Sequence, residues 1–129
     1  MTKKAEQELI ELTGQLLDSI AAADWDTYCR LCDPGLSAFE PEGRGHLVEG
    51  MEFHRYYFEL GAGKGPRKTT ISSPKVRLMG DVAVVTYVRL VQSLGEGGQP
   101  ATSAFEETRV WQIQQGTWRH VHFHRSRPS

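Results

Sequence analysis

The chain has 129 residues, the length of one ordinary domain, and 39% of them are hydrophobic while 24% are charged. A formal net charge of -1 gives no overall attraction to nucleic acid or to an anionic membrane. No apolar run approaches the roughly 18 residues of a membrane-spanning helix, and the N-terminus lacks the apolar stretch of a signal peptide. We therefore expect one cytoplasmic domain over residues 1–129, without nucleic-acid or membrane partners.

The first third of the chain predicts two helices and a strand. Leucines and an isoleucine recur at helical spacing over residues 3–22, with polar residues between them, which predicts an amphipathic helix. Asp24 is a favourable N-cap for a second, short helix over 25–31. Asp33-Pro34-Gly35 predicts a turn that ends this helix, and a short strand over 36–40 should follow.

Residues 46–59 predict a third helix. Leu47, Met51, His54 and Phe58 form one stripe at helical spacing. A lone histidine on such a stripe is more often a satisfied core residue than a ligand. Because histidine titrates near neutral pH, His54 could nevertheless take part in an anion site.

The second half of the chain predicts strands. A Gly-rich segment over 61–68 lacks the full spacing of a phosphate-binding loop, so we expect a solvated connection there. Glycine-containing turns separate the runs that follow. The predicted strands are about 69–79, 82–94, 102–114 and 117–126. Helices first and hairpin-linked strands afterward predict an α+β fold with an antiparallel sheet.

Three arginines fall on apolar strand faces. Strand alternation places Arg89, Arg109 and Arg125 among apolar neighbours, in strands that would lie side by side. Buried charges need partners, and Glu107 shares the face of Arg109. One carboxylate does not balance three guanidinium groups, which repel one another at short distance. The surplus favours an anion from outside these strands, such as a ligand, a peptide carboxylate or a neighbouring subunit.

A structural alternative is that each arginine pairs with a carboxylate from elsewhere in the fold. Glu40, Glu49 and Glu52 are candidates. Ion-pair networks of this kind are common in proteins that bind no ligand, so both interpretations stay open.

The opposite face of the strand over 82–94 is also apolar. Val82, Val84, Val88 and Leu90 lie on it. A strand that is apolar on both faces is usually covered on both sides. Three helices offer little cover, so contact with another subunit is one way to bury this second face.

Two further motifs raise metal or redox chemistry. His120, His122 and His124 alternate along one strand, and three imidazoles at that spacing could bind a metal. No carboxylate flanks them, which favours a wet or interfacial strand face. Cys29 and Cys32 have the C-x-x-C spacing, but no second pair completes a zinc site. We expect two reduced thiols, no metal and no cofactor.

Five long segments, in the order of the chain, carry a resemblance to a known family. They are DPGLSAFEPE at 33–42, LVEGMEFHRYYFE at 47–59, LMGD at 78–81, EETRVW at 106–111 and VHFHRS at 121–126. Together they closely resemble the association (hub) domain of calcium/calmodulin-dependent protein kinase type II. The resemblance runs from about residue 6 to residue 127.

The resemblance implies a nuclear transport factor 2-like fold, a cone in which a curved antiparallel sheet cups a long N-terminal helix. It also implies a self-assembling scaffold, a homo-oligomer of roughly a dozen or more subunits in two stacked rings. In the kinase, this domain gathers many catalytic domains into one holoenzyme.

The family's hub pocket contains a histidine and three arginines, and it is said to accept small carboxylates. These residues fall on His54, Arg89, Arg109 and Arg125. Neutralising one arginine should be tolerated by the fold, since it also removes repulsion between like charges. The loop over 60–66 is shorter than in the animal kinases and lacks their tryptophan, so no lid role is carried over to it.

Two other functions compete with a scaffold. Folds of this type also serve isomerases and dehydratases, where His54 or Glu107 would be the base and the arginines would stabilise an oxyanion. A small-molecule binding protein is the other alternative. A base beside fixed cations loses basicity, and the sequence contains no kinase catalytic motif, so we expect no enzymatic activity. Solution mass separates the scaffold from both alternatives.

Overall fold

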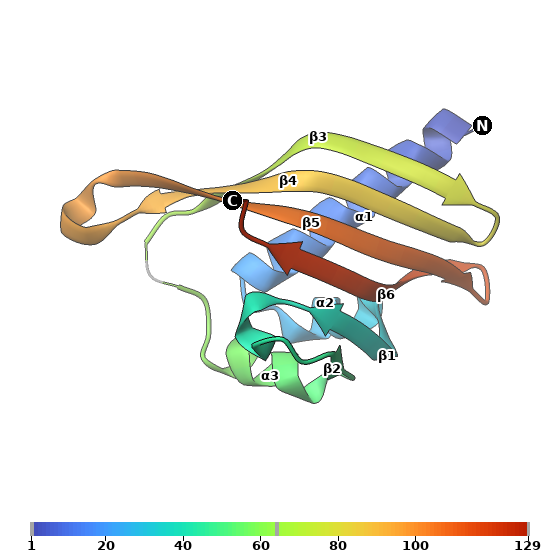
Figure 1. Cartoon of the computed structure of the whole chain (residues 1–129), viewed down its shortest axis with the longest axis horizontal. Helices are drawn as coiled ribbons and strands as arrows, with labels where there is room; N and C mark the ends of the chain where they lie inside the picture. The colour runs from blue at the N-terminus through green and yellow to red at the C-terminus, as the bar shows by residue number, and fades with distance from the viewer. Residues whose placement is uncertain (1, 64, 129) are drawn as a thin grey trace.

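The structure is a computed structural model that describes residues 2–63 and 65–128. A six-stranded curved sheet packs with one face against a long helix, and two short helices lie at one end (Figure 1). Among the described residues, no helix is both long and apolar enough to cross a membrane. The elements in chain order are α1 (Thr2–Ala21), α2 (Trp25–Leu31), β1 (Cys32–Phe39), the 3-10 turn η1 (Pro41–Gly43), β2 (Val48–Glu49), α3 (Glu52–Glu59), β3 (Lys68–Met79), β4 (Val82–Leu94), the 3-10 turn η2 (Glu96–Gly98), β5 (Pro100–Gln114) and β6 (Thr117–Ser126).

The N-terminal helices form for the reasons that the sequence suggested. The apolar stripe of α1 is buried, and Leu9, Leu16 and Leu17 belong to the main core. Asp24 caps α2, because its side chain accepts a hydrogen bond from the backbone N–H of Thr27 at 3.2 Å. Helix α1 runs behind β3 to β6 in Figure 1 and so covers the inner face of the sheet. The predicted α+β cone is confirmed.

The sheet is mixed, because one of its pairings is parallel. The strand order is β2-β1-β6-β5-β4-β3, and the pairings are antiparallel except for β1 with β6. The parallel pairing aligns Phe39 with His124. The chain that leaves β1 therefore continues beside Arg125, which follows His124 on β6.

Two sequence-based boundaries are wrong. Helix α3 begins at Glu52 instead of residue 46, because Val48–Glu49 pairs with β1 and Gly50 has a φ of 80°. Strand β1 begins at Cys32 instead of residue 36. The turn-forming residues Asp33 to Gly35 are accommodated within it as an irregularity between Cys32 and Ser37. There, the Asp33 carboxylate accepts a hydrogen bond from the Gly35 N–H at 2.8 Å.

The three histidines of β6 do not share one face, contrary to the prediction from alternation. A bulge between Val110 and Trp111 in the β5–β6 pairing changes the parity of β6. His120 is fully buried and stacks on Phe123, while His124 is exposed. The bulge also separates Val121 from Phe123, which strict alternation along β6 would place on one face.

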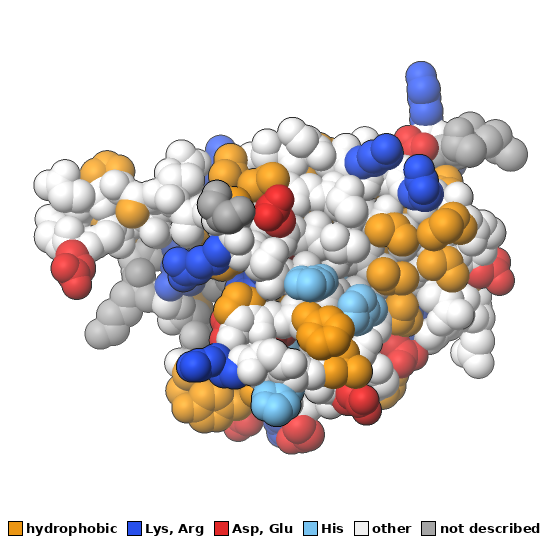
Figure 2. Space-filling model, in the orientation of Figure 1, with side chains coloured by type: hydrophobic (Ala, Val, Ile, Leu, Met, Phe, Trp, Pro, Cys, Tyr) orange, Lys and Arg blue, Asp and Glu red, His pale blue; other side chains and the backbone are white. Residues whose placement is uncertain are grey.

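Within the part of the chain that the structure describes, no helix covers the outer face of the sheet. It is the face turned toward the viewer in Figures 1 and 2, where hydrophobic side chains gather beside histidines. Phe39 is 40% exposed and Met79 is 50% exposed. The Phe39 ring lies against the rings of His122 and His124, at centroid distances of 6.2 and 5.8 Å.

Candidate functional site

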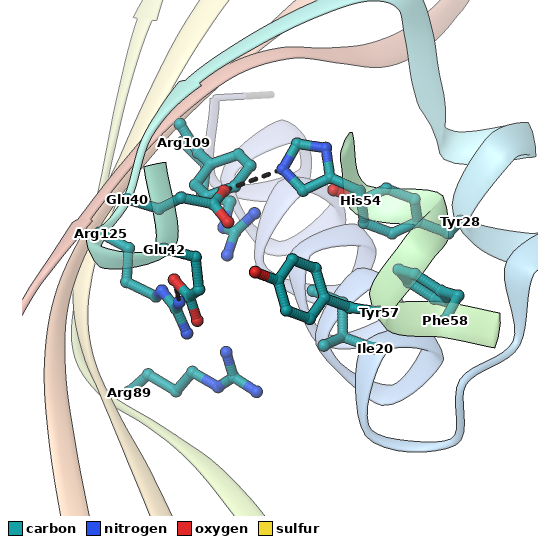
Figure 3. A pocket seen from close by; sticks show the side chains of 11 residues that line it. Ile20, Tyr28, Glu40, Glu42, His54, Tyr57, Phe58, Arg89, Arg109 and Arg125 are labelled. Carbon is teal, nitrogen blue, oxygen red and sulfur yellow. Dashed lines mark hydrogen bonds and ion pairs between the residues drawn. The ribbon is translucent and has the colours of Figure 1, made fainter. Parts of the chain in front are cut away.

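A cavity of about 160 Å³ lies between the inner face of the sheet, the C-terminal end of α1 and α3. Figure 3 shows the arginines on the sheet side of the cavity and Tyr28, Tyr57 and Phe58 on the helix side. It includes all four residues that the sequence singled out, His54, Arg89, Arg109 and Arg125. The other lining residues are Ile20, Tyr28, Glu40, Glu42, Tyr57, Phe58 and Phe123.

Strand alternation brings the arginines to this cavity, one each from β4, β5 and β6. Arg109 is the most enclosed, with 1% exposure. Its guanidinium carbon lies 4.3 Å from the centroid of the Phe123 ring, a cation–π contact. Arg125 lies over the Phe105 ring in the same way, at 5.0 Å.

Glu107 is the central acceptor of a buried hydrogen-bond network. Its Oε1 accepts from Arg109 Nη2 at 2.9 Å and from the Tyr87 hydroxyl at 2.5 Å. Its Oε2 accepts from Arg89 Nη1 at 3.4 Å. Arg109 Nε also donates to the Tyr87 hydroxyl at 3.1 Å. This carboxylate is therefore fixed on both oxygens.

The charges of the network keep Glu107 ionised. Burial alone would raise the pKa of Glu107, but the guanidinium groups of Arg109 and Arg89 hold it below its usual value. Burial opposes the charge of Arg109 as well, yet Tyr87 and Glu107 raise its pKa above the usual arginine value. Burial raises the pKa of Tyr87 to about 12, so its hydroxyl remains a donor at neutral pH.

Glu42 is the partner of Arg125. It lies on η1, and its carboxylate accepts a hydrogen bond from Arg125 Nη2. Burial would raise the pKa of Glu42, but the hydrogen bond and the charge of Arg125 hold it below its usual value. This ion pair is at the mouth of the cavity, since the Glu42 side chain is 36% exposed and that of Arg125 is 17% exposed.

His54 is held from the opposite side. Its Nε2 lies 2.8 Å from Oε2 of Glu40, and both side chains are buried. The imidazole packs between the rings of Tyr28 and Phe123, at centroid distances of 6.1 and 5.6 Å. Figure 3 draws the contact between His54 and Glu40 as a dashed line.

The charge balance differs from the sequence-based expectation of excess cations. Three arginines and three carboxylates line or adjoin the cavity, because the segment after β1 supplies Glu40 and Glu42. Arg125 therefore pairs with a carboxylate from elsewhere in the fold, as the structural alternative predicted, but the partner is Glu42 and not one of the three candidates named from the sequence. Glu52 instead pairs with Arg55 on the surface, at 3.8 Å.

Several polar atoms of the site nevertheless lack partners. Among the described residues, these buried nitrogens form no hydrogen bond: His54 Nδ1, Arg89 Nε, Arg109 Nη1 and Arg125 Nε. Three of them are guanidinium N–H donors, and a buried donor without an acceptor is destabilising. These N–H groups can therefore donate hydrogen bonds to the oxygen atoms of a bound carboxylate.

The other candidate motifs do not form a site. No group of three or more His, Cys, Asp or Glu residues within 2–63 and 65–128 is placed to hold a metal ion. Cys29 and Cys32 are free thiols, and burial raises the pKa of Cys32 to about 12. Cys32 Sγ lies 3.5 Å from Nδ1 of His120, in the core.

Sequence reasoning did not single out Glu42, Tyr57 and Tyr87, although Glu42 and Tyr57 line the cavity and Tyr87 belongs to the network of Glu107. Tyr87 could have been found, because it shares the inner face of β4 with Arg89. Glu42 and Tyr57 gave no such signal, since neither lies on a strand. Their positions depend on how β1 pairs with β6 and on where α3 begins.

Comparisons with known proteins identify relatives over nearly the whole chain. A family model described as calcium/calmodulin dependent protein kinase II association domain matches residues 5–129. The delta subunit of calcium/calmodulin-dependent protein kinase type II from Oryctolagus cuniculus is 50% identical over 127 residues. The match covers 96% of this chain and 24% of that subunit, so the chain spans about a quarter of the relative's length.

Solved structures agree with the sequence matches. The association domain of C. elegans CaMKII has a TM-score of 0.91 at 46% identity, covering 96% of each chain. The Chlamydomonas reinhardtii CaMKII hub homology domain has a TM-score of 0.90 at 45% identity, covering 97% of this chain and 99% of that one. A nuclear transport factor 2-like superfamily protein from Salmonella enterica, with a TM-score of 0.79 at 24% identity and coverage of 100% and 94%, shares the fold.

Proposed function

This chain belongs to the calcium/calmodulin dependent protein kinase II association domain family, and we propose that residues 1–129 form one hub domain that assembles copies of itself. The proposed assembly is a closed homo-oligomer of roughly a dozen or more subunits in two stacked rings, because cyclic closure leaves no unpaired interface. Its role is that of a scaffold, which holds many copies of whatever is attached to it at high local concentration.

The outer face of the sheet is the observation that carries this proposal. Val84 and Val110 are cross-strand neighbours there, and both are only half-buried within one subunit. Phe39 and Met79 on β1 and β3 add exposed apolar surface. Large obligate interfaces bury apolar surface of this kind. A second subunit against this face would complete its burial.

The pocket has a separate proposed role, which is to bind a small carboxylate through His54, Arg89, Arg109 and Arg125. The unpartnered guanidinium nitrogens support it, since they supply donors that no residue of the described chain satisfies. A cavity of about 160 Å³ has room for a molecule of only a few non-hydrogen atoms.

The network around Glu107 argues against this residue as the general base of an isomerase or dehydratase. A general base must be able to take up a proton near neutral pH. Arg109 and Arg89 outweigh burial and hold the pKa of Glu107 below its usual value, while Arg109, Arg89 and Tyr87 occupy both of its oxygens. Its chemistry is therefore that of a structural counter-ion.

Light scattering of the purified chain at micromolar concentration tests the assembly. We expect a mass many times the 14.5 kDa of one subunit. A single species of subunit mass would contradict the scaffold proposal and favour a binding protein.

Thermal unfolding with added acetate tests the pocket. Acetate at about one hundred times its dissociation constant should stabilise the native state by about 2.7 kcal/mol, and the shift should be larger at low salt. Arg125→Gln should abolish the shift. Arg55→Gln is the matched control, because Arg55 is an exposed arginine on α3 that does not line the cavity. An equal shift in the Arg125→Gln protein would refute the proposal.

A further inference from the structure

The three carboxylates beside the arginines differ in how firmly they are held. The Glu107 side chain has no exposure and is hydrogen-bonded through both oxygens. The Glu40 side chain is 5% exposed and is bonded to His54. Glu42, by contrast, is 36% exposed and has one partner, Arg125. Glu42 is therefore the carboxylate that can leave.

We infer that Glu42 is an internal carboxylate that occupies the ligand position at Arg125, and that an incoming ligand with a single negative charge replaces it. This inference rests on the proposed carboxylate-binding role of the pocket. In this inference, Glu42 selects the charge of the ligand. The Glu42 carboxylate on η1 is called the internal plug, because it occupies the ligand position until a ligand displaces it.

The local backbone allows Glu42 to move without disturbing the sheet. It lies in a three-residue 3-10 turn that follows the end of β1 and precedes β2. Exposed residues follow this turn, with Arg44 at a φ of 52° and Gly45 at a φ of 90°. No backbone ladder bond of the sheet depends on the Glu42 side chain. Its carboxylate regains water when it swings outward, whereas a displaced Glu107 would leave Arg109 buried without a counter-ion.

The charge count specifies the ligand. With Glu42 in place, Arg89, Arg109 and Arg125 face Glu40, Glu42 and Glu107. With Glu42 in solvent, one positive charge is uncompensated. A monocarboxylate restores the balance and can accept from the free Arg125 donors. A neutral amide does not restore it, and a dicarboxylate brings one negative charge too many into a low-dielectric site.

Calorimetric titration of acetate into the whole protein tests whether the ligand has to displace the Glu42 carboxylate from Arg125. Glu42→Gln keeps the size of the side chain but removes its charge, so acetate no longer has to displace an ion pair. We expect acetate to bind about two- to fivefold more tightly to this variant, the range set by a partly exposed ion pair. Glu49→Gln is the matched control, since Glu49 is exposed on the neighbouring β2 and does not line the cavity. Its affinity should equal that of the wild type.

The outcomes separate this inference from the pocket proposal. If acetate binds the Glu42→Gln protein equally or more weakly and still binds the wild type, the displacement of Glu42 is wrong, but the carboxylate-binding role of the pocket stands. Absence of acetate binding in both proteins overturns the pocket and the plug together. Should Glu42→Gln fail to fold, Glu42→Asp keeps the charge but shortens its reach to Arg125, and it too must bind acetate more tightly.

Two further titrants test the charge class in the wild-type protein. Acetamide has the shape of acetate without its charge, and malonate carries a second carboxylate. Both should bind more weakly than acetate at matched ionic strength. If either binds as tightly as acetate, selection for a single negative charge is wrong.

Discussion

Two neighbouring rows of residues cross the same sheet, one on each face. The inner row is mostly buried and has an arginine at its centre, and the outer row is half-buried at its centre and polar at its ends. The inner row is Val76, Val85, Arg109, Phe123, Ala38 and Val48, and the outer row is Arg77, Val84, Val110, His122, Ser37 and Glu49.

The difference shows that buried charges must be paired within one subunit, whereas apolar surface can wait for a neighbouring subunit. An unpaired charge in the interior is far more destabilising than exposed apolar surface. Arg109 is accordingly paired with Glu107 and Tyr87 within the chain. Val84 and Val110 are left half-covered, which a single subunit can tolerate until another subunit packs against them.

The largest expected effect comes from adjacent residues on opposite faces of β5. Glu107→Gln leaves Arg89 and Arg109 buried without a charged partner, and it should lower the free energy of unfolding by about 3 to 5 kcal/mol. Glu106→Gln changes the same charge on the exposed face, where we expect a change within about 0.5 kcal/mol. Urea unfolding of both variants measures the contrast. Similar losses in the two would show that the faces do not differ as proposed.

Arginine substitutions sharpen the contrast within the inner face. The sequence suggested that one arginine could be neutralised without harm, but the structure limits this expectation to Arg125. Arg109→Gln removes a partner from buried Glu107 and should cost about 3 kcal/mol. Arg125→Gln breaks a pair with half-exposed Glu42 and should cost about 1 kcal/mol or less. Thermal unfolding of the two variants without ligand measures both losses. A larger loss of stability in Arg125→Gln than in Arg109→Gln would contradict the prediction.

Acid should weaken the inner face in two stages. Burial, with the charge of Arg109, holds the pKa of His120 well below 6.5, so its stabilising contribution is present above pH 6.5 and is lost as pH falls further. The pKa of Glu107 is held below 4.5 by Arg109 and Arg89 against the effect of burial, so its contribution is full above pH 4.5 and is lost below.

One such group changes the free energy of unfolding by about 1.4 kcal/mol per pH unit within its window. Urea unfolding between pH 4.5 and 7 should therefore show a decline that begins near pH 6.5. His120→Gln should flatten that decline, whereas His46→Gln, which changes an exposed histidine, should not. An unchanged slope in His120→Gln would remove His120 as its source.

The smallest effect on the folded subunit is expected on the outer row. Val84→Lys places a charge at its apolar centre, and the lysine stem can lie along the strand with its ammonium in water. Stability of the isolated subunit should change by about 0.5 kcal/mol or less. The mass from light scattering should nevertheless fall, because a subunit interface there would bury that charge. Val84→Thr keeps the β-branched shape and should retain the full mass, and a full-sized assembly of Val84→Lys would exclude this face as the interface.

The sequence by itself determined those features that depend on local geometry. Strand β4 spans the predicted 82–94, β6 spans 117–126, and α2 spans 25–31. The position of each of Arg89, Arg109 and Arg125 beside apolar residues on one face of its own strand follows from the two-residue repeat of a strand, which needs no knowledge of the neighbouring strands.

Only the tertiary structure decided how those charges are satisfied. The bulge in β6 moves His120 into the core, and the parallel pairing of β1 with β6 brings Glu42 to Arg125, although they are 83 positions apart in the sequence. Alternation states which way a side chain points, but ion-pair partners depend on which distant segments meet. Long-range pairing is set by burial across the whole sheet, so residue order alone does not reveal it.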